Sequence, residues 1–482
     1  MASIGGSSSN QPASSFNPNA NYTVPLVLMV SLFFMIGFIT VLNDVLIPSL
    51  KGLFDLKPWQ AMLIQFCFFG AYGLMSIPAG MLIQKVGYKK GLTISLAIMG
   101  VGLFLFVPAS IVISYAFFLL ALFTVAIGLT ILQVAINPYI VALGPEETGA
   151  SRLNLGGTLN STATFIGPII GGAFILKHGL IDPIQKAEAV RGPYIVLALM
   201  TIGIAAALYF IKLPKLSSEV GADEKLEGSA WDFKHLIYGA GAIFFYVGAE
   251  VAIGSILILY LVEENLIKVS ANILEGISTE KLASSLLAYY WGSAMIGRFI
   301  GSILGQKVKA QIMLQVVTVV ALALVGLSIF GVFNNSWIDI PVMILQTQNT
   351  FSVSFQSITV PVTAILLVLV GLFNSVMWPC IFPLSLNGLG KHTSQGSGIL
   401  VTMVVGGAFI PLGQGYLAEV IGYQFSFLIV FACYLYILFF AVSGYINRNN
   451  IAGKLNSLDS YDMQDNKKIN DGSPLKETID IK

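Results

Sequence analysis

Long apolar runs, separated by short polar connections, fill the chain between residues 25 and 446. A helix needs about 20 apolar residues to cross the hydrocarbon core of a membrane. These runs are continuous, whereas the strands of membrane β-barrels alternate in polarity over about 10 residues. The pattern therefore predicts twelve membrane-spanning helices. Their expected ranges are 25–50, 58–84, 91–112, 115–143, 152–176, 193–213, 236–262, 282–306, 310–333, 360–386, 394–418 and 422–446.

Composition strengthens this prediction and excludes several classes of protein. Of the 482 residues, 56% are hydrophobic and only 10% are charged, and the mean hydropathy is +0.83. Soluble domains carry about 25% charged residues, so a water-soluble fold is excluded. The net charge of +1 and the lack of a long basic block give no indication of a nucleic-acid partner.

No pattern for catalysis or metal binding is visible. Cys67, Cys380 and Cys433 fall in apolar runs and form no disulfide framework, and the three histidines fall in separate loops. Nucleotide-binding loops and the usual hydrolase and zinc-protease motifs are absent from the sequence. We therefore expect no enzymatic activity and no cofactor or metal. Any uphill transport must draw its energy from an ion gradient.

A charged connection, Lys212 to His235, divides the spans six and six. A weak repeat supports two related halves, because Gly80–Gly91 and Gly301–Gln311 both place Lys-Val and a basic loop at the end of a span. Such halves are typical of the major facilitator fold, an all-α membrane architecture. A polar stretch, Asn334 to Thr359, contains an apolar piece, Ile340 to Leu345, which is too short to cross a membrane.

The predicted domains are a disordered tail (1–24), an N-terminal half (25–213), a cytoplasmic linker (214–235), a C-terminal half (236–446) and a cytoplasmic tail (447–482).

Orientation follows from the basic residues of the connections. With both termini inside, the inner connections carry twelve Lys and Arg residues and the outer connections carry seven. Basic residues favour the cytoplasmic side, so we expect a multi-pass protein of the bacterial inner membrane with both termini in the cytoplasm.

Asp44 is the first charged residue of the chain, and it lies inside an apolar run. Gly37, Thr40 and Asp44 share one stripe of the first predicted helix. An acid at membrane depth is expensive and is a functional candidate by default. A helix beginning at Pro25 would, however, place Asp44 about 29 Å along its axis, close to the interface with water. Periodicity leaves both interpretations open.

Other polar residues recur in the predicted spans. Glu250 lies midway along the seventh span and shares a face with Tyr246; it could bind substrate, carry a proton or pair with an interior donor. Amides and aromatic groups suit a sugar, although each can equally serve in helix packing. The substrate-binding candidates are Asn43, Gln65, Gln133, Asn137, Asn160, Tyr290, Asn374 and Trp378. The candidates for gating or structure are Arg298, Pro138 and Pro379.

Four long motifs resemble the fucose–galactose–glucose:proton symporters, a family of major facilitators. FFMIGFITVLNDVLIPSLK (Phe33 to Lys51) resembles that family's first span. Leu132 to Ser161 resembles spans four and five, Phe244 to Ser255 resembles span seven, and Gly371 to Gly390 resembles span ten. The resemblance runs from Tyr22 to Asn447, and it is greatest for the glucose/galactose transporter-like branch.

The resemblance implies an alternating-access sugar–cation symporter. Asp44 matches the proton-carrying acid of the family's LND motif, and Asn160 matches a polar position that lines its cavity. The fucose branch has a glutamate where this chain has Gln133, which cannot titrate. This difference argues against fucose and leaves Asp44 and Glu250 as the proton-coupling candidates.

We therefore expect proton-coupled uptake of a glucose- or galactose-like hexose by a monomer in contact with membrane lipid. Three alternatives remain open: coupling to Na⁺, passive facilitation, and a membrane sensor that binds sugar without moving it.

Overall fold

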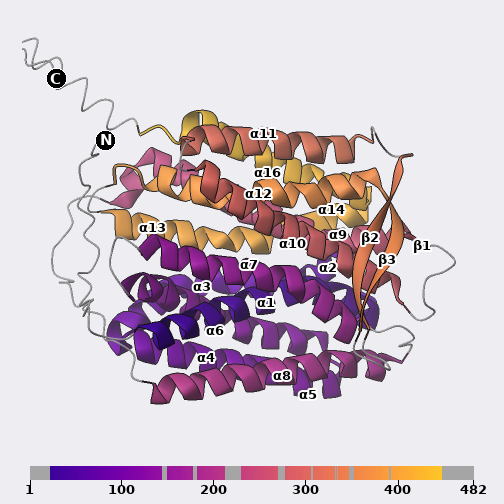
Figure 1. Ribbon diagram of the computed structural model, residues 1–482, viewed down its shortest axis with the longest axis horizontal. Coiled ribbons are helices and arrows are strands. Elements are labelled where there is room, and N and C mark those ends of the chain that lie inside the picture. Colours follow the sequence, from indigo (N-terminus) through magenta and orange to yellow (C-terminus); the bar gives the residue numbers. More distant parts are fainter. Residues whose placement is uncertain are drawn as a thin grey trace, which may run out of the picture.

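A computed structural model describes residues 22–143, 149–176, 182–211, 229–269, 277–305, 308–331, 333, 335–346, 352–389 and 392–447. Figure 1 shows a bundle of roughly parallel helices, with the indigo and purple N-terminal half below the orange and yellow C-terminal half. Both predicted tails lie almost wholly outside the described residues, as does most of the predicted linker.

The N-terminal half contains eight helical segments within the described ranges. α1 carries Asp44 and runs for 32 residues, well beyond the 20 needed to cross a bilayer. The segments are α1 (Thr23–Phe54), α2 (Pro58–Ala61), α3 (Leu63–Val86), α4 (Tyr88–Phe104), α5 (Phe106–Val112), α6 (Tyr115–Ala142), α7 (Gly149–Phe174) and α8 (Pro183–Phe210).

The C-terminal half begins with a short 3-10 turn and a 30-residue helix, α9, whose membrane portion is the most buried of the apolar helices. Its helical segments are η2 (Ala230–Asp232), α9 (Lys234–Glu263), α10 (Thr279–Leu304), α11 (Ala310–Ile329), α12 (Val362–Leu386), α13 (Thr393–Thr402), η4 (Met403–Val405), α14 (Gly406–Ile421), α15 (Tyr423–Ser426), α16 (Leu428–Phe439) and η5 (Phe440–Gly444).

The predicted helical membrane fold is confirmed, with one difference in the count of spans. Ten helical stretches within the described ranges are long and apolar enough to cross a membrane. The two other predicted spans, 152–176 and 282–306, correspond to α7 and α10, which have 26 residues each. These helices carry Arg152 and Arg298 and are less apolar, so twelve spans remain a prediction.

A β-hairpin interrupts the helical pattern, and the sequence analysis did not predict it. β2 (Trp337–Gln346) pairs antiparallel with β3 (Ser352–Pro361), and β1 (Lys268–Val269) pairs with the other edge of β3. The short apolar piece of the polar stretch, Ile340 to Leu345, therefore belongs to a strand. In Figure 1 the hairpin crosses one end of the bundle. We call this end the hairpin end; α1 and α9 both finish there, at Phe54 and Glu263.

The hairpin touches both halves. Leu345 of β2 belongs to a small apolar cluster with Ile169 and Ala173 of α7 and Ala288 of α10. The Tyr289 hydroxyl of α10 also donates to the backbone oxygen of Pro341 at 2.6 Å. The hairpin therefore bridges the contact between α7 and α10, which belong to different halves.

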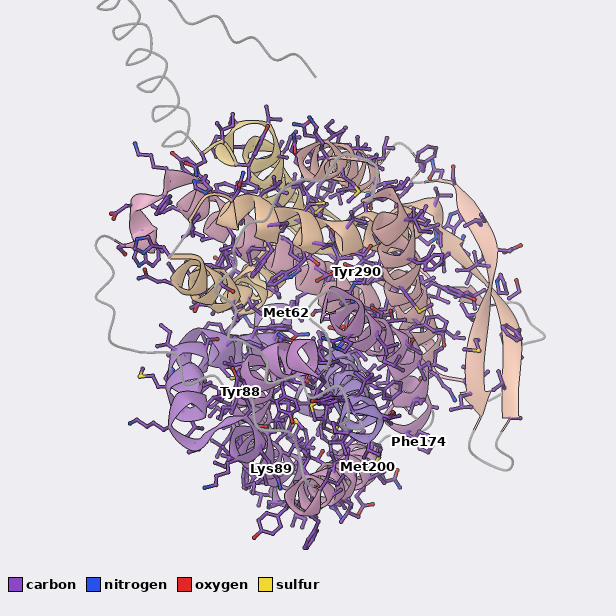
Figure 2. The ribbon with its side chains drawn as sticks, turned by 60° about the vertical axis from the view of Figure 1, so that its left-hand side comes forward. Met62, Tyr88, Lys89, Phe174, Met200 and Tyr290 are labelled. Atoms are coloured by element: carbon purple, nitrogen blue, oxygen red, sulfur yellow. The ribbon has the colours of Figure 1, made fainter. Side chains whose placement is uncertain are left out.

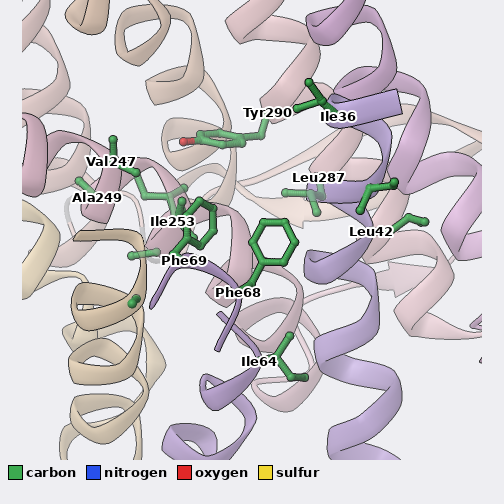
Figure 3. Packing of buried hydrophobic residues seen from close by; sticks show 14 of the residues in the cluster. Ile36, Leu42, Ile64, Phe68, Phe69, Val247, Ala249, Ile253, Leu287 and Tyr290 are labelled. Atoms are coloured by element: carbon green, nitrogen blue, oxygen red, sulfur yellow. The ribbon is translucent and has the colours of Figure 1, made fainter. Parts of the chain in front are cut away.

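One continuous apolar core joins the halves. Figure 3 shows Phe68 and Phe69 of α3 close to Val247 and Ile253 of α9. Figure 2 places Tyr290 near the boundary between the halves, whereas Lys89 and Met200 lie far from it within the N-terminal half. Residues at this boundary therefore contact both halves of the chain.

Candidate functional site

The Asp44 carboxyl lies buried at the boundary between the halves, with 3% of the residue exposed. Gln65 Nε2 of α3 donates to Asp44 Oδ1 at 2.9 Å. Ser255 Oγ of α9 donates to the same oxygen at 3.0 Å and accepts from Gln65 Nε2 at 2.8 Å. We call these three residues the carboxyl cluster. The burial rejects the alternative in which Asp44 is a solvated residue at a helix end.

A close helix contact supports the carboxyl cluster. A methyl group on Gly254 would lie 3.3 Å from Asp44 Oδ2 and 3.3 Å from Trp291 Cζ2. A glycine at this point leaves room for the backbone of α9 to approach α1. It also places the Trp291 indole of α10 beside the carboxyl.

The carboxyl cluster is electrically unusual because its hydrogen-bond donors are neutral. The ion pairs found among the described residues are Lys51–Glu263, Lys57–Glu419 and Glu188–Arg191, and none involves Asp44. A buried charge without a counter-charge is strongly disfavoured unless hydrogen bonds compensate for the lost water. Adding a proton to Asp44 or removing one therefore changes the strength of its hydrogen bonds to Gln65 and Ser255.

The second intramembrane acid, Glu250, has different surroundings. The side chains of Arg298 on α10 and Tyr246 on α9 act electrostatically on its carboxyl group. Its Oε1 is buried and accepts no hydrogen bond from the residues that the structure describes. Buried carboxylate oxygens are normally hydrogen bonded, so this oxygen is available to a ligand.

A chain of buried hydrogen bonds fixes two predicted sugar-binding residues. Asn374 Nδ2 on α12 donates to the Tyr290 hydroxyl at 3.0 Å, and that hydroxyl donates to the Glu250 backbone oxygen at 3.1 Å. The Tyr434 hydroxyl of α16 donates to Asn374 Oδ1 at 2.6 Å. The structure thus brings Tyr290 and Asn374 together, but both are occupied by protein partners.

Two further predicted residues contact the opposite half or a neighbouring helix. Arg298 Nη1 donates to Ser161 Oγ of α7 at 2.6 Å, which joins the halves and fits its predicted gating or structural role. Asn160 Nδ2 donates to the backbone oxygen of Phe33 at 3.1 Å, within the N-terminal half.

The remaining predicted residues are more dispersed. Asn43 is 1% exposed, and its Nδ2 has no partner within the described ranges. Gln133 is half-buried and Asn137 is exposed. Trp378 stacks on Phe382 with a centroid distance of 5.6 Å. Pro379 is an exposed residue inside α12, and the side chain of Pro138 lies outside the described part of the structure.

Ser255, Trp291 and Tyr434 were not among the predicted site residues. Ser255 lies five residues after Glu250 in the predicted seventh span, and its place in that span was the available signal. Nothing in the sequence indicates that Tyr434 bonds to Asn374, because hydroxyl groups are common in such helices.

Comparison with known proteins decides the family. Residues 28–364 match the model of the Major Facilitator Superfamily. The chain belongs to the Major Facilitator Superfamily. Its relatives include a glucose/galactose transporter of Brucella abortus, 43% identical over 88% of this chain and 95% of that protein. The L-fucose-proton symporter of Escherichia coli is 30% identical over 83% of this chain and 88% of that protein.

Solved structures agree with this assignment. The major facilitator FucP in its outward conformation is 30% identical, with a TM-score of 0.61 over 87% of this chain and 98% of that chain. The predicted resemblance to the fucose–galactose–glucose symporters is confirmed. Membership of a family of transporters also agrees with the prediction that this facilitator is not an enzyme.

Proposed function

We propose that this major facilitator takes up a glucose- or galactose-like hexose together with a proton, by alternating access. The relatives named above transport such sugars or couple a sugar to a proton, as their names state. The observation that carries the proposal is the carboxyl cluster, where a buried acid meets both halves at once. A proton-coupled carrier needs an acid whose protonation changes how its halves contact each other.

The chemistry of the carboxyl cluster suits this role. An ionised carboxylate only accepts hydrogen bonds, whereas a protonated one has an O–H to donate. Ionised Asp44 accepts from Gln65 in its own half and from Ser255 in the other half. Protonation removes the charge that strengthens both bonds and adds a donor that needs an acceptor. Proton binding therefore changes the contact between the halves.

For the sugar we propose a site beside the carboxyl cluster. Asn43 Nδ2 and Glu250 Oε1 are buried, and neither is bonded to any described residue. An amide donor and a carboxylate acceptor are suitable partners for sugar hydroxyls. Tyr290 and Asn374 have protein partners, so in this proposal they position Glu250. Gln133, Asn137, Asn160, Gln65 and Trp378 stay candidates for further contacts.

The proposal places the protein in the bacterial inner membrane with both termini in the cytoplasm. The hairpin end then faces outward. It is closed here, because Lys51–Glu263 and Lys57–Glu419 each join the two halves, at 2.7 and 2.6 Å.

Purified protein in liposomes tests the proposal. An inward proton gradient is imposed, and labelled glucose, galactose, mannose, N-acetylglucosamine and fucose are assayed for accumulation. We expect accumulation of glucose or galactose, its collapse by a protonophore, and no effect of replacing sodium by choline at fixed pH. Uptake that needs sodium would support the sodium-coupled alternative. Uptake that never exceeds equilibration would indicate a facilitator, and sugar binding without flux would indicate a sensor.

A further inference from the structure

Ser255 of the C-terminal half hydrogen-bonds to the buried acid of the N-terminal half. The residue is fully buried. Its hydroxyl accepts from Gln65 Nε2 at 2.8 Å and donates to Asp44 Oδ1 at 3.0 Å. Asp44 and Gln65 lie on α1 and α3, whereas Ser255 lies on α9, so both of its bonds cross the boundary between the halves.

This hydrogen-bond arrangement is strongest while the acid is ionised, because bonds to a charged acceptor are about twice as strong as bonds to a neutral one. A serine hydroxyl has a single proton, and here that proton goes to Asp44 Oδ1. Once Asp44 is protonated, its new O–H needs an acceptor, and Gln65 Nε2 cannot accept. Gln65 Oε1 is buried and has no partner within the described residues, so it is the available acceptor. Proton uptake can then redirect Gln65 toward the acid and weaken the bond between Asp44 and Ser255.

Within the described part of the chain, the neighbours of the Asp44 carboxyl are neutral. The polar groups acting on the carboxyl are Ser255 of α9, Trp291 of α10 and Gln65 of α3, and no charged group among the described residues acts on it. The elements packed against α1 therefore supply only neutral partners to Asp44. The protonation state of Asp44 therefore sets the strength of its hydrogen bond to Ser255.

The ion pair of Lys51 and Glu263 is a second contact between α1 and α9, the two helices that the bond from Ser255 to Asp44 joins. Lys51 lies seven residues after Asp44 on α1, and Glu263 lies eight residues after Ser255 on α9, about two helical turns in each case. Their ion pair measures 2.7 Å, and its side chains are 17% and 39% exposed. α1 and α9 thus contact each other at two levels. A partly exposed ion pair lies near the hairpin end, and the buried bond to Asp44 lies about two turns further from that end.

We propose that Ser255 is the positioning residue that couples the ionisation of Asp44 to closure of the hairpin end. While Asp44 is ionised, its bond to Ser255 holds α9 against α1; protonation weakens that bond and favours opening on the hairpin side. This inference rests on the proposed function, because it takes Asp44 as the proton-binding acid.

The test compares three variants in liposomes. Ser255→Ala removes the bond, and Ser255→Thr keeps the hydroxyl. Ser284→Ala is the matched control, because the buried Ser284 hydroxyl of α10 also crosses the boundary but donates to a backbone oxygen, that of Pro168 on α7, at 2.5 Å. For each variant we measure proton-driven accumulation between pH 5 and 8 and sugar–sugar counterflow, which needs no net proton movement.

The loss of one hydrogen bond to a charged group predicts about a tenfold fall in accumulation for Ser255→Ala, with a flattened pH profile and a much smaller change in counterflow. Ser255→Thr and Ser284→Ala should keep the parental pH profile. An unchanged profile in Ser255→Ala, or the same flattening in Ser284→Ala, would overturn the role of Ser255. If the parent itself shows no proton-driven accumulation, the proposed function fails, and this inference fails with it.

Discussion

The two intramembrane acids differ in what surrounds them. Asp44 bonds to neutral donors from both halves, and Oδ1 alone accepts two bonds. Glu250 lies within the C-terminal half, near Tyr246 and Arg298, and one of its oxygens is unused by any described residue. An acid whose bonds cross the boundary is suited to coupling, whereas an acid with a vacant oxygen is suited to binding a ligand. The sequence analysis named both as proton-coupling candidates and left substrate binding open for Glu250; their surroundings favour separate roles.

The largest expected effect is that of Asp44→Asn. Asparagine cannot carry the proton, so accumulation should be lost completely, while sugar–sugar counterflow persists. Uptake driven by a proton gradient and counterflow in the same liposomes provide the measurement. Asp339→Asn is the matched control, because Asp339 is an exposed acid of the hairpin that bonds to Thr359. Normal uphill uptake by Asp44→Asn would remove Asp44 from the coupling step.

Glu250→Gln tests whether Glu250 binds the sugar rather than the coupling proton. If the unused oxygen receives a sugar hydroxyl, loss of a charge-assisted bond should raise the KM for counterflow about tenfold. Uphill accumulation should persist at saturating sugar concentration. Glu264→Gln serves as a control, because Glu264 is an exposed acid at the C-terminal end of the same helix. The opposite outcome, an unchanged KM with lost accumulation, would make Glu250 a second proton carrier and end the distinction.

A moderate effect is expected from Tyr434→Phe, which removes one bond of Asn374 without changing the packing volume. Asn374 would then lose an orienting partner, and a buried acceptor would be unsatisfied at a cost of about 1–3 kcal/mol. We expect a lower unfolding temperature and a KM raised by a factor of a few. The Tyr436 hydroxyl bonds to a backbone oxygen in an exposed setting, so Tyr436→Phe should change neither. Equal effects in the two variants would contradict a positioning role for Tyr434.

The smallest effect is expected at the ion pair of Lys51 and Glu263. A partly exposed pair contributes about 0–1 kcal/mol, so Lys51→Gln should change accumulation less than fivefold. Exchanging the two charges, Lys51→Glu with Glu263→Lys, should restore the parental value. A loss as complete as that of Asp44→Asn would show that the closure of the hairpin end depends on this pair rather than on the buried acid.

Helices and site contacts differ in how well a sequence can predict them. The apolar runs predicted the helices closely; the expected ranges 115–143 and 236–262 correspond to α6 at Tyr115–Ala142 and α9 at Lys234–Glu263. The hairpin was not predicted because its apolar piece was considered only as a membrane span, for which it is too short; Pro341 inside the run also gives no strand signal. Its ten-residue pairing also depends on contacts that no local pattern reveals.

The partners of the site residues were less predictable than the residues themselves. Asp44 stood out because a charge in an apolar run is rare. Its bond to Ser255 spans 211 residues of sequence, and it depends on how α1 and α9 are rotated and how far they are shifted along each other. Similarly, Asn374 was recognisable as a buried amide, yet its engagement by Tyr434 required the packing of α12 against α16 to be known.

The contact between α1 and α7 limits where movement can occur. A methyl group on Gly167 of α7 would lie 2.2 Å from Val41 Cγ1, and one on Gly171 would lie 2.8 Å from Leu42 Cδ2. Side chains of α1 fill the space that these glycines leave, so α1 has little room to slide or turn within its own half. This packing fixes the backbone of α1 around Asp44 against α7, so a movement of the other half would change the contact with Ser255 rather than the seat of α1. A saturation-mutagenesis screen for growth on sugar should consequently find Gly167 as intolerant as the acid itself, although it touches neither sugar nor proton.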